Sequence, residues 1–124
     1  MPAALHHLKK RSEFLAVAGT NRRWTTPGLV LQARLRPNDA QNSDTSGVEA
    51  DLHVGFTATK KIGNAVKRNR ARRRLRAAVA DVLRGLPTVP ADLVIVARQG
   101  TIDRPYVELK TDLQVALHRL RVVR

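Results

Sequence analysis

Apolar and polar positions alternate or recur along the chain in a way that predicts three strands. Leu29 to Leu35 alternates with outward polar positions at Gln32 and Arg34. Leu52 to Thr59 alternates too, with Leu52, Val54, Phe56 and Ala58 on one face. Ala91 to Arg98 is apolar almost throughout, which is typical of a central strand buried on both faces.

A short N-terminal helix and a longer C-terminal helix are predicted from capping residues and helical periodicity. Ser12 can cap the first helix, and Gly19 ends it. The segment from Tyr106 to Val122 is amphipathic and predicts the second. The expected buried positions are Phe14, Leu15 and Val17 in the first helix, and Leu109, Leu113, Ala116, Leu117 and Leu120 in the second.

A third helix, of roughly twenty residues, is expected after a Gly63–Asn64 turn, and Gly85 and Pro87 mark its end. On a helical wheel the apolar residues form one stripe, and part of the arginines lie opposite. The stripe contains Leu75, Val79, Val82 and Leu86, and the opposite side contains Arg70, Arg73 and Arg84. Cations crowd the first turns and apolar residues the later ones, so binding and packing are separated along one helix.

This order of elements, α-β-β-(β)-α-β-α with an optional hairpin strand, predicts an α+β sandwich of one sheet and helices. The 124 residues are expected to form one domain, 1–124. Residues 8–36 supply the N-terminal helix and first strand, 37–51 a polar loop, and 52–124 the remaining sheet and helices.

Composition narrows the functional class. Aromatic residues make up only 3% of the chain, so the core must be aliphatic. A formal net charge of +13 predicts an anionic partner. The absence of Cys excludes disulfides and thiolate metal sites. No apolar run approaches the ~20 residues that span a bilayer, and no signal peptide is recognisable, so a cytoplasmic protein without a membrane partner is expected.

The most informative segment runs from Lys60 to Arg76, KKIGNAVKRNRARRRLR, and contains nine cations and no acid. Such a charge density repels itself unless a polyanion neutralises it, and phosphates are the usual polyanion. A solvated helix normally pairs its cations with acids one turn away, and this segment offers none. The pattern therefore favours nucleic-acid binding over a solubilising surface.

Other classes of site and partner receive less support. The four histidines lack metal-ligand spacing, and the ten acids are dispersed, so no two-metal nuclease site and no other metal site is predicted. The chain is therefore not expected to cleave RNA alone. A membrane-surface helix would need bulky apolar residues opposite its cations, and Ala65, Val66 and Ala71 are too small. A DNA-reading dimer has no half-site signal here.

The segment TKKIGNAVKRNRARRRLR resembles the bacterial ribonuclease P protein subunit, whose RNR motif is Arg68-Asn69-Arg70 here. The stretches LKKRSEFLAV, VGFTATKK and DLVIVAR occur in the order found in that family. The resemblance implies a small sandwich with a sheet of four strands, in which the basic helix makes an uncommon left-handed crossover between parallel strands.

By resemblance, the chain is an accessory subunit of an endoribonuclease. It binds the catalytic RNA subunit, with one protein per RNA, and the 5′ leader of precursor tRNA. It thereby assists removal of the leader and broadens substrate specificity. The resemblance assigns the chemistry to the RNA, with Mg²⁺ held mainly by RNA and phosphates, and implies no catalytic residue and no small-molecule substrate for this chain.

The resemblance and the charge pattern give two sets of candidate site residues. The expected RNA-subunit-binding residues are Lys60, Lys61, Asn64, Lys67, Arg68, Asn69, Arg70, Arg72, Arg73 and Arg76. The expected leader-binding residues, around a cleft between the sheet and the N-terminal helix, are Phe14, Val17, Gln32, Arg34, Phe56, Thr57 and Thr59. Arg68 and Arg72 should approach the sheet, whereas Arg70 and Arg73 should face outward.

Several positions leave alternatives open. Arg74, Ala18 and Gln32 stand where the family often has other residue types: an aliphatic one at Arg74, aromatic ones at the other two. Asn69 either bonds RNA or fixes the approach to the helix, and Trp24 either stacks on RNA or covers the sheet edge. A ribosomal protein that binds rRNA is the alternative function, and composition alone does not separate it.

Overall fold

The computed structural model describes residues 5–7, 11–19, 22–35, 52–84 and 91–123. The strands are β1 (Leu5–His7), β2 (Arg23–Thr25), β3 (Leu29–Leu35), β4 (Leu52–Thr57) and β5 (Ala91–Ala97). The α-helices are α1 (Arg11–Ala18), α2 (Ala65–Leu83), α3 (Gln99–Asp103) and α4 (Tyr106–Arg119), and a short 3-10 helix, η2, spans Lys60–Ile62. The predicted α+β class is confirmed.

The five strands form one sheet in the order β1-β4-β5-β3-β2. The continuously apolar β5 lies at the centre, antiparallel to β3 and parallel to β4. Helix α2 connects β4 to β5, so it is the crossover between two adjacent parallel strands. The two outermost strands, β1 and β2, have only three residues each.

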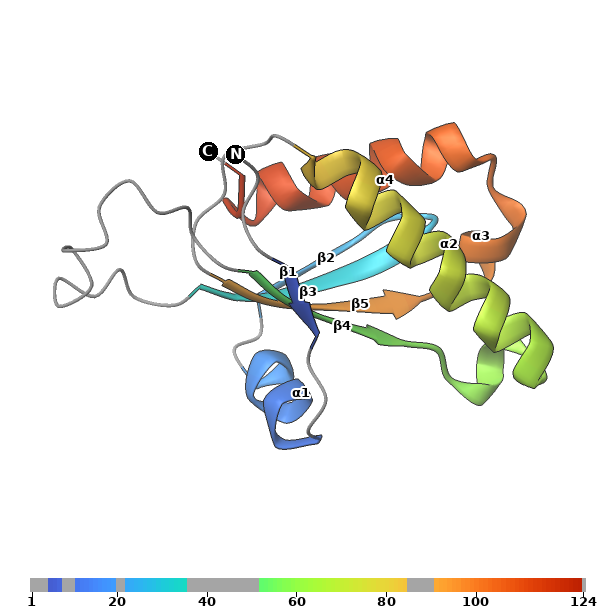
Figure 1. Ribbon diagram of the computed structural model, residues 1–124, viewed down its shortest axis with the longest axis horizontal. Coiled ribbons are helices and arrows are strands. Elements are labelled where there is room, and N and C mark those ends of the chain that lie inside the picture. The colour runs from blue at the N-terminus through green and yellow to red at the C-terminus, as the bar shows by residue number, and fades with distance from the viewer. Residues whose placement is uncertain (1–4, 8–10, 20–21, 36–51, 85–90, 124) are drawn as a thin grey trace, which may run out of the picture.

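Helices cover both faces of the sheet. Helices α2 and α4 lie on one face, and α1 lies on the other (Figure 1). The main core fills the space under α2 and α4, and Leu31, Leu75, Ile95 and Leu113 are among its fully buried side chains. Most of that core is aliphatic, as the composition predicts.

A second, smaller core lies under α1. Val17 and Val94 are buried there, with Phe14 and Val96 packed against them. Residues that alternate along a strand point to opposite faces of the sheet. The valines of β5 at 94 and 96 therefore face α1, while Ile95 faces α2 and α4.

The long, periodic elements occur where the pattern predicts them. All five expected buried positions of the C-terminal helix are buried, and so are Leu75, Val79 and Val82 of the basic helix. In the N-terminal helix Val17 is buried, but the prediction for Leu15 is wrong, because its side chain is 57% exposed. The sequence did not predict β1, β2, η2 or α3. Helix α2 ends at Leu83, and the expected helix-ending residues Gly85 and Pro87, together with Leu86 and the polar loop 37–51, lie outside the described residues.

Candidate nucleic-acid interface

Helix α2 begins at a well-defined cap. Oδ1 of Asn64 accepts a hydrogen bond from the backbone N–H of Lys67 at 3.0 Å, the usual geometry of an N-cap. Gly63 has a φ of 138°, a conformation that side chains rarely adopt. The first turn contains no acid, so the positive end of the helix dipole adds to the attraction for anions.

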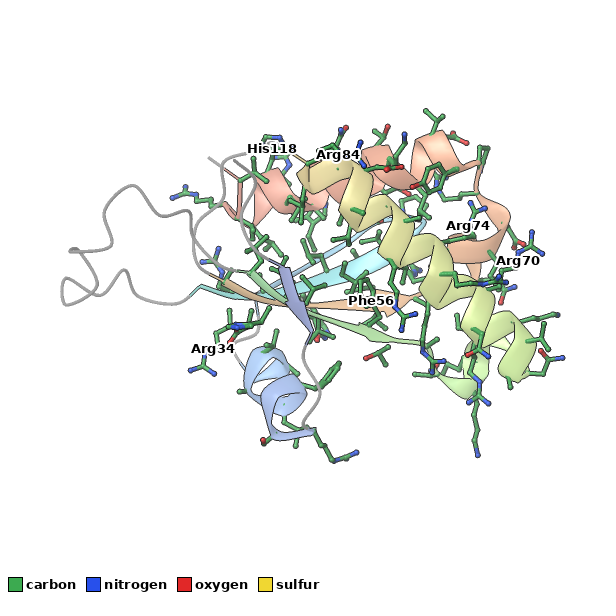
Figure 2. The ribbon with its side chains drawn as sticks, viewed as in Figure 1. Arg34, Phe56, Arg70, Arg74, Arg84 and His118 are labelled. Atoms are coloured by element: carbon green, nitrogen blue, oxygen red, sulfur yellow. The ribbon has the colours of Figure 1, made fainter. Side chains whose placement is uncertain are left out.

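The arginines of the first turns divide into two groups by exposure. Arg70 and Arg73 are exposed, whereas Arg68 and Arg72 are half-buried. The outward placement predicted for Arg70 and Arg73 is therefore confirmed, and the approach of Arg68 and Arg72 to the sheet stays a prediction. Figure 2 shows Arg70 projecting away from the sheet near the start of α2. Exposed guanidinium groups on one helix can each fork onto phosphate oxygens.

Asn69 contacts a neighbouring arginine. Its Oδ1 accepts a hydrogen bond from Nη1 of Arg72 at 3.0 Å, three residues along the helix. This contact holds one guanidinium group in place while its remaining N–H groups stay available. Holding Arg72 is thus a role for the amide beyond the two that the sequence left open.

Arg74 differs from its neighbours because backbone carbonyls bind it. Its Nε donates to the carbonyl oxygen of Thr101 at 2.8 Å, and its Nη2 donates to the carbonyl oxygen of Arg104. Thr101 lies within α3 and Arg104 is its C-cap, so Arg74 fastens α2 to α3. Arg74 is one of the nine cations between Lys60 and Arg76, but its contacts hold two helices of the protein together.

The 3-10 helix η2 places two more cations at the same end of the molecule. Lys60 and Lys61 are exposed, while Ile62 is buried in the main core and anchors the segment. Thr59 is exposed at its N-cap. Arg76, one turn beyond Arg72, lies over the ring of Phe56 with 5.8 Å from Cζ to the centroid.

The face of the sheet under α1 carries most of the expected leader-binding residues. Residues in register on neighbouring strands point to the same face. Gln32 pairs with Val94, and Thr57 pairs with Val96, so both polar side chains lie beside the small core under α1. Phe14 packs against the same valines and is half-buried.

A polar row crosses the same face nearer one end of the sheet. His53 and Arg34 both pair in register with Asp92. Nδ1 of His53 lies 3.0 Å from Oδ1 of Asp92. Arg34 is exposed, and Figure 2 shows it on the side of the sheet where α1 lies. The row thus places an exposed cation on the α1 face.

Two of the expected leader-binding residues are placed differently from the rest. Phe56 packs on the main core under α2, on the opposite face of the sheet from Phe14 and Thr57 (Figure 2). Adjacent residues of a strand alternate between faces, so Phe56 and Thr57 cannot share one. Val17 of α1 is 1% exposed and packs with Val94 of the sheet, so its side chain is buried in the small core.

Neither a metal cluster nor a membrane span is found in the part of the chain that the structure describes. No three His, Cys, Asp or Glu side chains are grouped there so that they could hold a metal ion. The described carboxylates of Asp92 and Asp112 instead contact His53 and Arg104. None of the described helices is long and apolar enough to cross a bilayer.

A cationic strip runs along the edge strand β2, where the sequence predicted no strand but left open whether Trp24 stacks on RNA or covers the sheet edge. Trp24 and Arg119 contact each other there, with 5.2 Å from Cζ of Arg119 to the Trp24 ring centroid. Nη2 of Arg22 donates to the carbonyl oxygen of Leu120 at 2.6 Å. Adjacent arginines before a tryptophan were the available signal, but neither helical nor strand periodicity marks them.

Taken together, the α+β fold and the acid-free first turns of α2 indicate a small RNA-binding protein. The sequence profile of the ribonuclease P family matches residues 3–121. Two similar curated proteins are each named ribonuclease P protein component. The one from Paramagnetospirillum magneticum is 48% identical over 97% of this chain and 86% of its own. The one from Gluconacetobacter diazotrophicus is 48% identical over 94% of this chain and 92% of its own.

Two solved structures have the same fold as this chain. The RNase P protein of Staphylococcus aureus superposes with a TM-score of 0.72 at 20% identity, over 96% of this chain and 98% of that one. The protein from Thermotoga maritima gives 0.67 at 19% identity, over 94% and 96%. The chain belongs to the ribonuclease P family, and a role in tRNA processing through RNA binding follows from the family. The alternative of a ribosomal protein is thereby set aside.

Proposed function

We propose that this chain binds the RNA subunit of ribonuclease P through the start of α2 and binds the precursor tRNA leader on the α1 face of the sheet. The RNA subunit performs the hydrolysis, and the protein lowers the electrostatic cost of bringing two RNAs together. One protein binds one RNA, in the cytoplasm. The 5′ leader is then removed to give the mature end.

The observation that carries this proposal is that the two halves of α2 have different surroundings. Its later turns pack Leu75, Val79 and Val82 into the core, while its first turns present exposed Arg70 and Arg73 without any acid. Because Arg70 and Arg73 are exposed, their guanidinium groups can move to meet phosphates at little cost to folding. An electrostatic surface of this kind binds a folded RNA through its backbone.

The α1 face supports the second half of the proposal. Phe14 supplies an aromatic ring, Gln32 and Thr57 supply hydrogen-bonding groups, and Arg34 supplies a cation. These are the elements of a single-strand site, where bases stack on aromatic side chains and cations follow the backbone. The two surfaces lie on different elements, so each RNA can have its own contacts.

The chemistry is proposed to reside in the RNA partner. Mg²⁺ is expected on the RNA and on phosphates, and the carboxylate side chains described above form no group suited to hold it. In this proposal the protein contributes binding and orientation, and the RNA supplies the chemistry. Its effect should be largest where Mg²⁺ is scarce, because protein cations then replace metal in neutralising the phosphates.

A cleavage assay on precursor tRNA at low Mg²⁺ tests the proposal. Protein alone should give no product, RNA alone little, and the two together full cleavage at the mature 5′ end. Cleavage by protein that has been stripped of nucleic acid would contradict the assignment of chemistry to the RNA. Equal rates with and without protein would contradict the assisting role.

A further inference from the structure

The edge strand β2 continues the α1 face of the sheet. Arg23 pairs in register with Gln32, so its side chain lies on the same face as the proposed leader-binding residues. Strands lie about 4.8 Å apart. Arg23 lies on the strand next to that of Gln32, and two strands away from Val94, which lies under α1.

The next residue of β2 turns to the other side of the edge. Trp24 pairs with Leu31, which faces the main core, so its ring lies on the α4 side. There the guanidinium of Arg119 lies over the ring at 5.2 Å. Trp24 nevertheless stays 37% exposed. Two successive residues thus present a cation on one side of the sheet edge and an aromatic–cation pair on the other.

Neither Arg23 nor Arg119 forms an ion pair with another residue that the structure describes. One structural use is clear for the arginine of α4, since a cation in the last turn offsets the helix dipole. That use does not require an exposed tryptophan beside it, nor an exposed arginine on the neighbouring strand.

The strip lies far from the cations of α2. Figure 2 shows Arg70, at the start of α2, and His118, in the last turn of α4, at opposite ends of the helical layer. An RNA segment bound at the edge of β2 would therefore contact different residues from an RNA bound at the start of α2. The register, in contrast, connects the edge directly with the α1 face.

We propose that the edge of β2 is an extension of the leader-binding face, which binds the upstream part of a long, single-stranded 5′ leader. Arg23 contacts a leader phosphate as the strand leaves the α1 face, and a base beyond it stacks on the Trp24–Arg119 pair. This inference rests on the proposed function. It predicts that long leaders bind more tightly than short ones because of this protein edge.

Precursors that differ only in leader length provide the test. We compare leaders of about four and about twelve nucleotides, since single-strand sites span roughly 4–16. The wild-type holoenzyme should bind the long-leader precursor roughly fivefold or more tightly, the factor expected for one stacked base. The double variant R23Q/R119Q should lose this advantage and leave short-leader affinity unchanged. For R23Q/R119Q, the slope of log K against log salt should become shallower by about 0.7 per lost phosphate contact. This change is expected with the long-leader precursor alone.

The control and the second readout use features of this chain. K110Q removes a cation from an earlier turn of α4, where Lys110 lies over Tyr106, and should keep the leader-length advantage. Trp24 is the only tryptophan, so its fluorescence reports on this edge. Long-leader precursor should change that fluorescence, and short-leader precursor should not.

Two results would overturn the proposal: an unchanged long-leader advantage in R23Q/R119Q, or an equal loss for both leaders. Failure of the proposed function would look different, because the wild-type protein would then neither bind the RNA subunit nor favour precursor over mature tRNA.

Discussion

The phenol of Tyr106 donates a hydrogen bond to Oδ2 of Asp81 at 2.6 Å and thereby joins the first turn of α4 to the last turns of α2. Burial of the phenol, and then this hydrogen bond, raise the pKa of Tyr106 to about 12. The contact fixes the packing end of α2, whose other end carries the cations that we propose bind RNA.

The raised pKa predicts a pH dependence of stability. The unfolded chain ionises its tyrosine near pH 10, so the contribution of Tyr106 is fully present below that pH and is lost as pH rises toward 12. Because the chain has one tyrosine, absorbance at the tyrosinate band titrates this residue alone. D81N should lower the midpoint toward the ordinary value. A wild-type midpoint near 10 would contradict the burial of the phenol.

Removing Arg74 should affect folding more than binding. R74A deletes two hydrogen bonds from a charged donor to backbone carbonyls. We expect a loss of about 2 kcal/mol in the free energy of unfolding, from denaturant titration followed by circular dichroism. The matched variant R73A removes an exposed cation one residue away and should change stability by less than about 0.5 kcal/mol. Equal destabilisation by both would count against the carbonyl contacts.

Removing the RNR arginines should affect RNA binding more than folding. R68A/R70A should weaken affinity for the RNA subunit roughly tenfold or more, because charged hydrogen bonds to phosphate are lost. The slope of log K against log salt should become shallower by about 1.4 to 1.8, from two contacts. Filter binding over a salt series measures both. R84A, an exposed cation at the C-cap of the same helix, is the control. An unchanged slope in R68A/R70A would exclude these arginines from the interface.

The two phenylalanines should separate leader binding from stability. F14A removes the ring beside the α1 face and should reduce the preference for precursor over mature tRNA about fivefold or more. F56A, on the opposite face beneath Arg76, should instead lower the free energy of unfolding by about 2 kcal/mol and spare that preference. Affinity for the RNA subunit should persist in F14A. A parallel loss of both RNA affinities in F14A would argue against two surfaces.

The sequence predicted the elements whose signal is local and long. Helix α2 is recognisable from the Gly63–Asn64 turn before it and from the stripe of Leu75, Val79 and Val82, all within one continuous segment. Strand β5 is recognisable because burial on both faces makes it apolar throughout. In both cases neighbouring residues carry the information, so no knowledge of the rest of the fold is needed.

The remaining elements depend on distant partners. Strand β1 pairs with β4, which lies more than forty residues away in the chain, and its three residues carry no periodicity. Strand β2 is exposed throughout, so no apolar alternation marks it. The same holds for Arg74, whose acceptors lie 27 and 30 residues away. Phe56 is a different case, because strict alternation along β4 already separates it from Thr57.

The arginines of β2 also bear on how copies of the free protein behave toward one another. An edge strand offers unpaired backbone groups to any second strand, and proteins often guard such edges with short length and charge. Here β2 has three residues, and exposed Arg22 and Arg23 lie at its start. Two copies that approached along this edge would bring like charges together. Self-association by strand pairing at β2 is therefore opposed for as long as those charges are not neutralised.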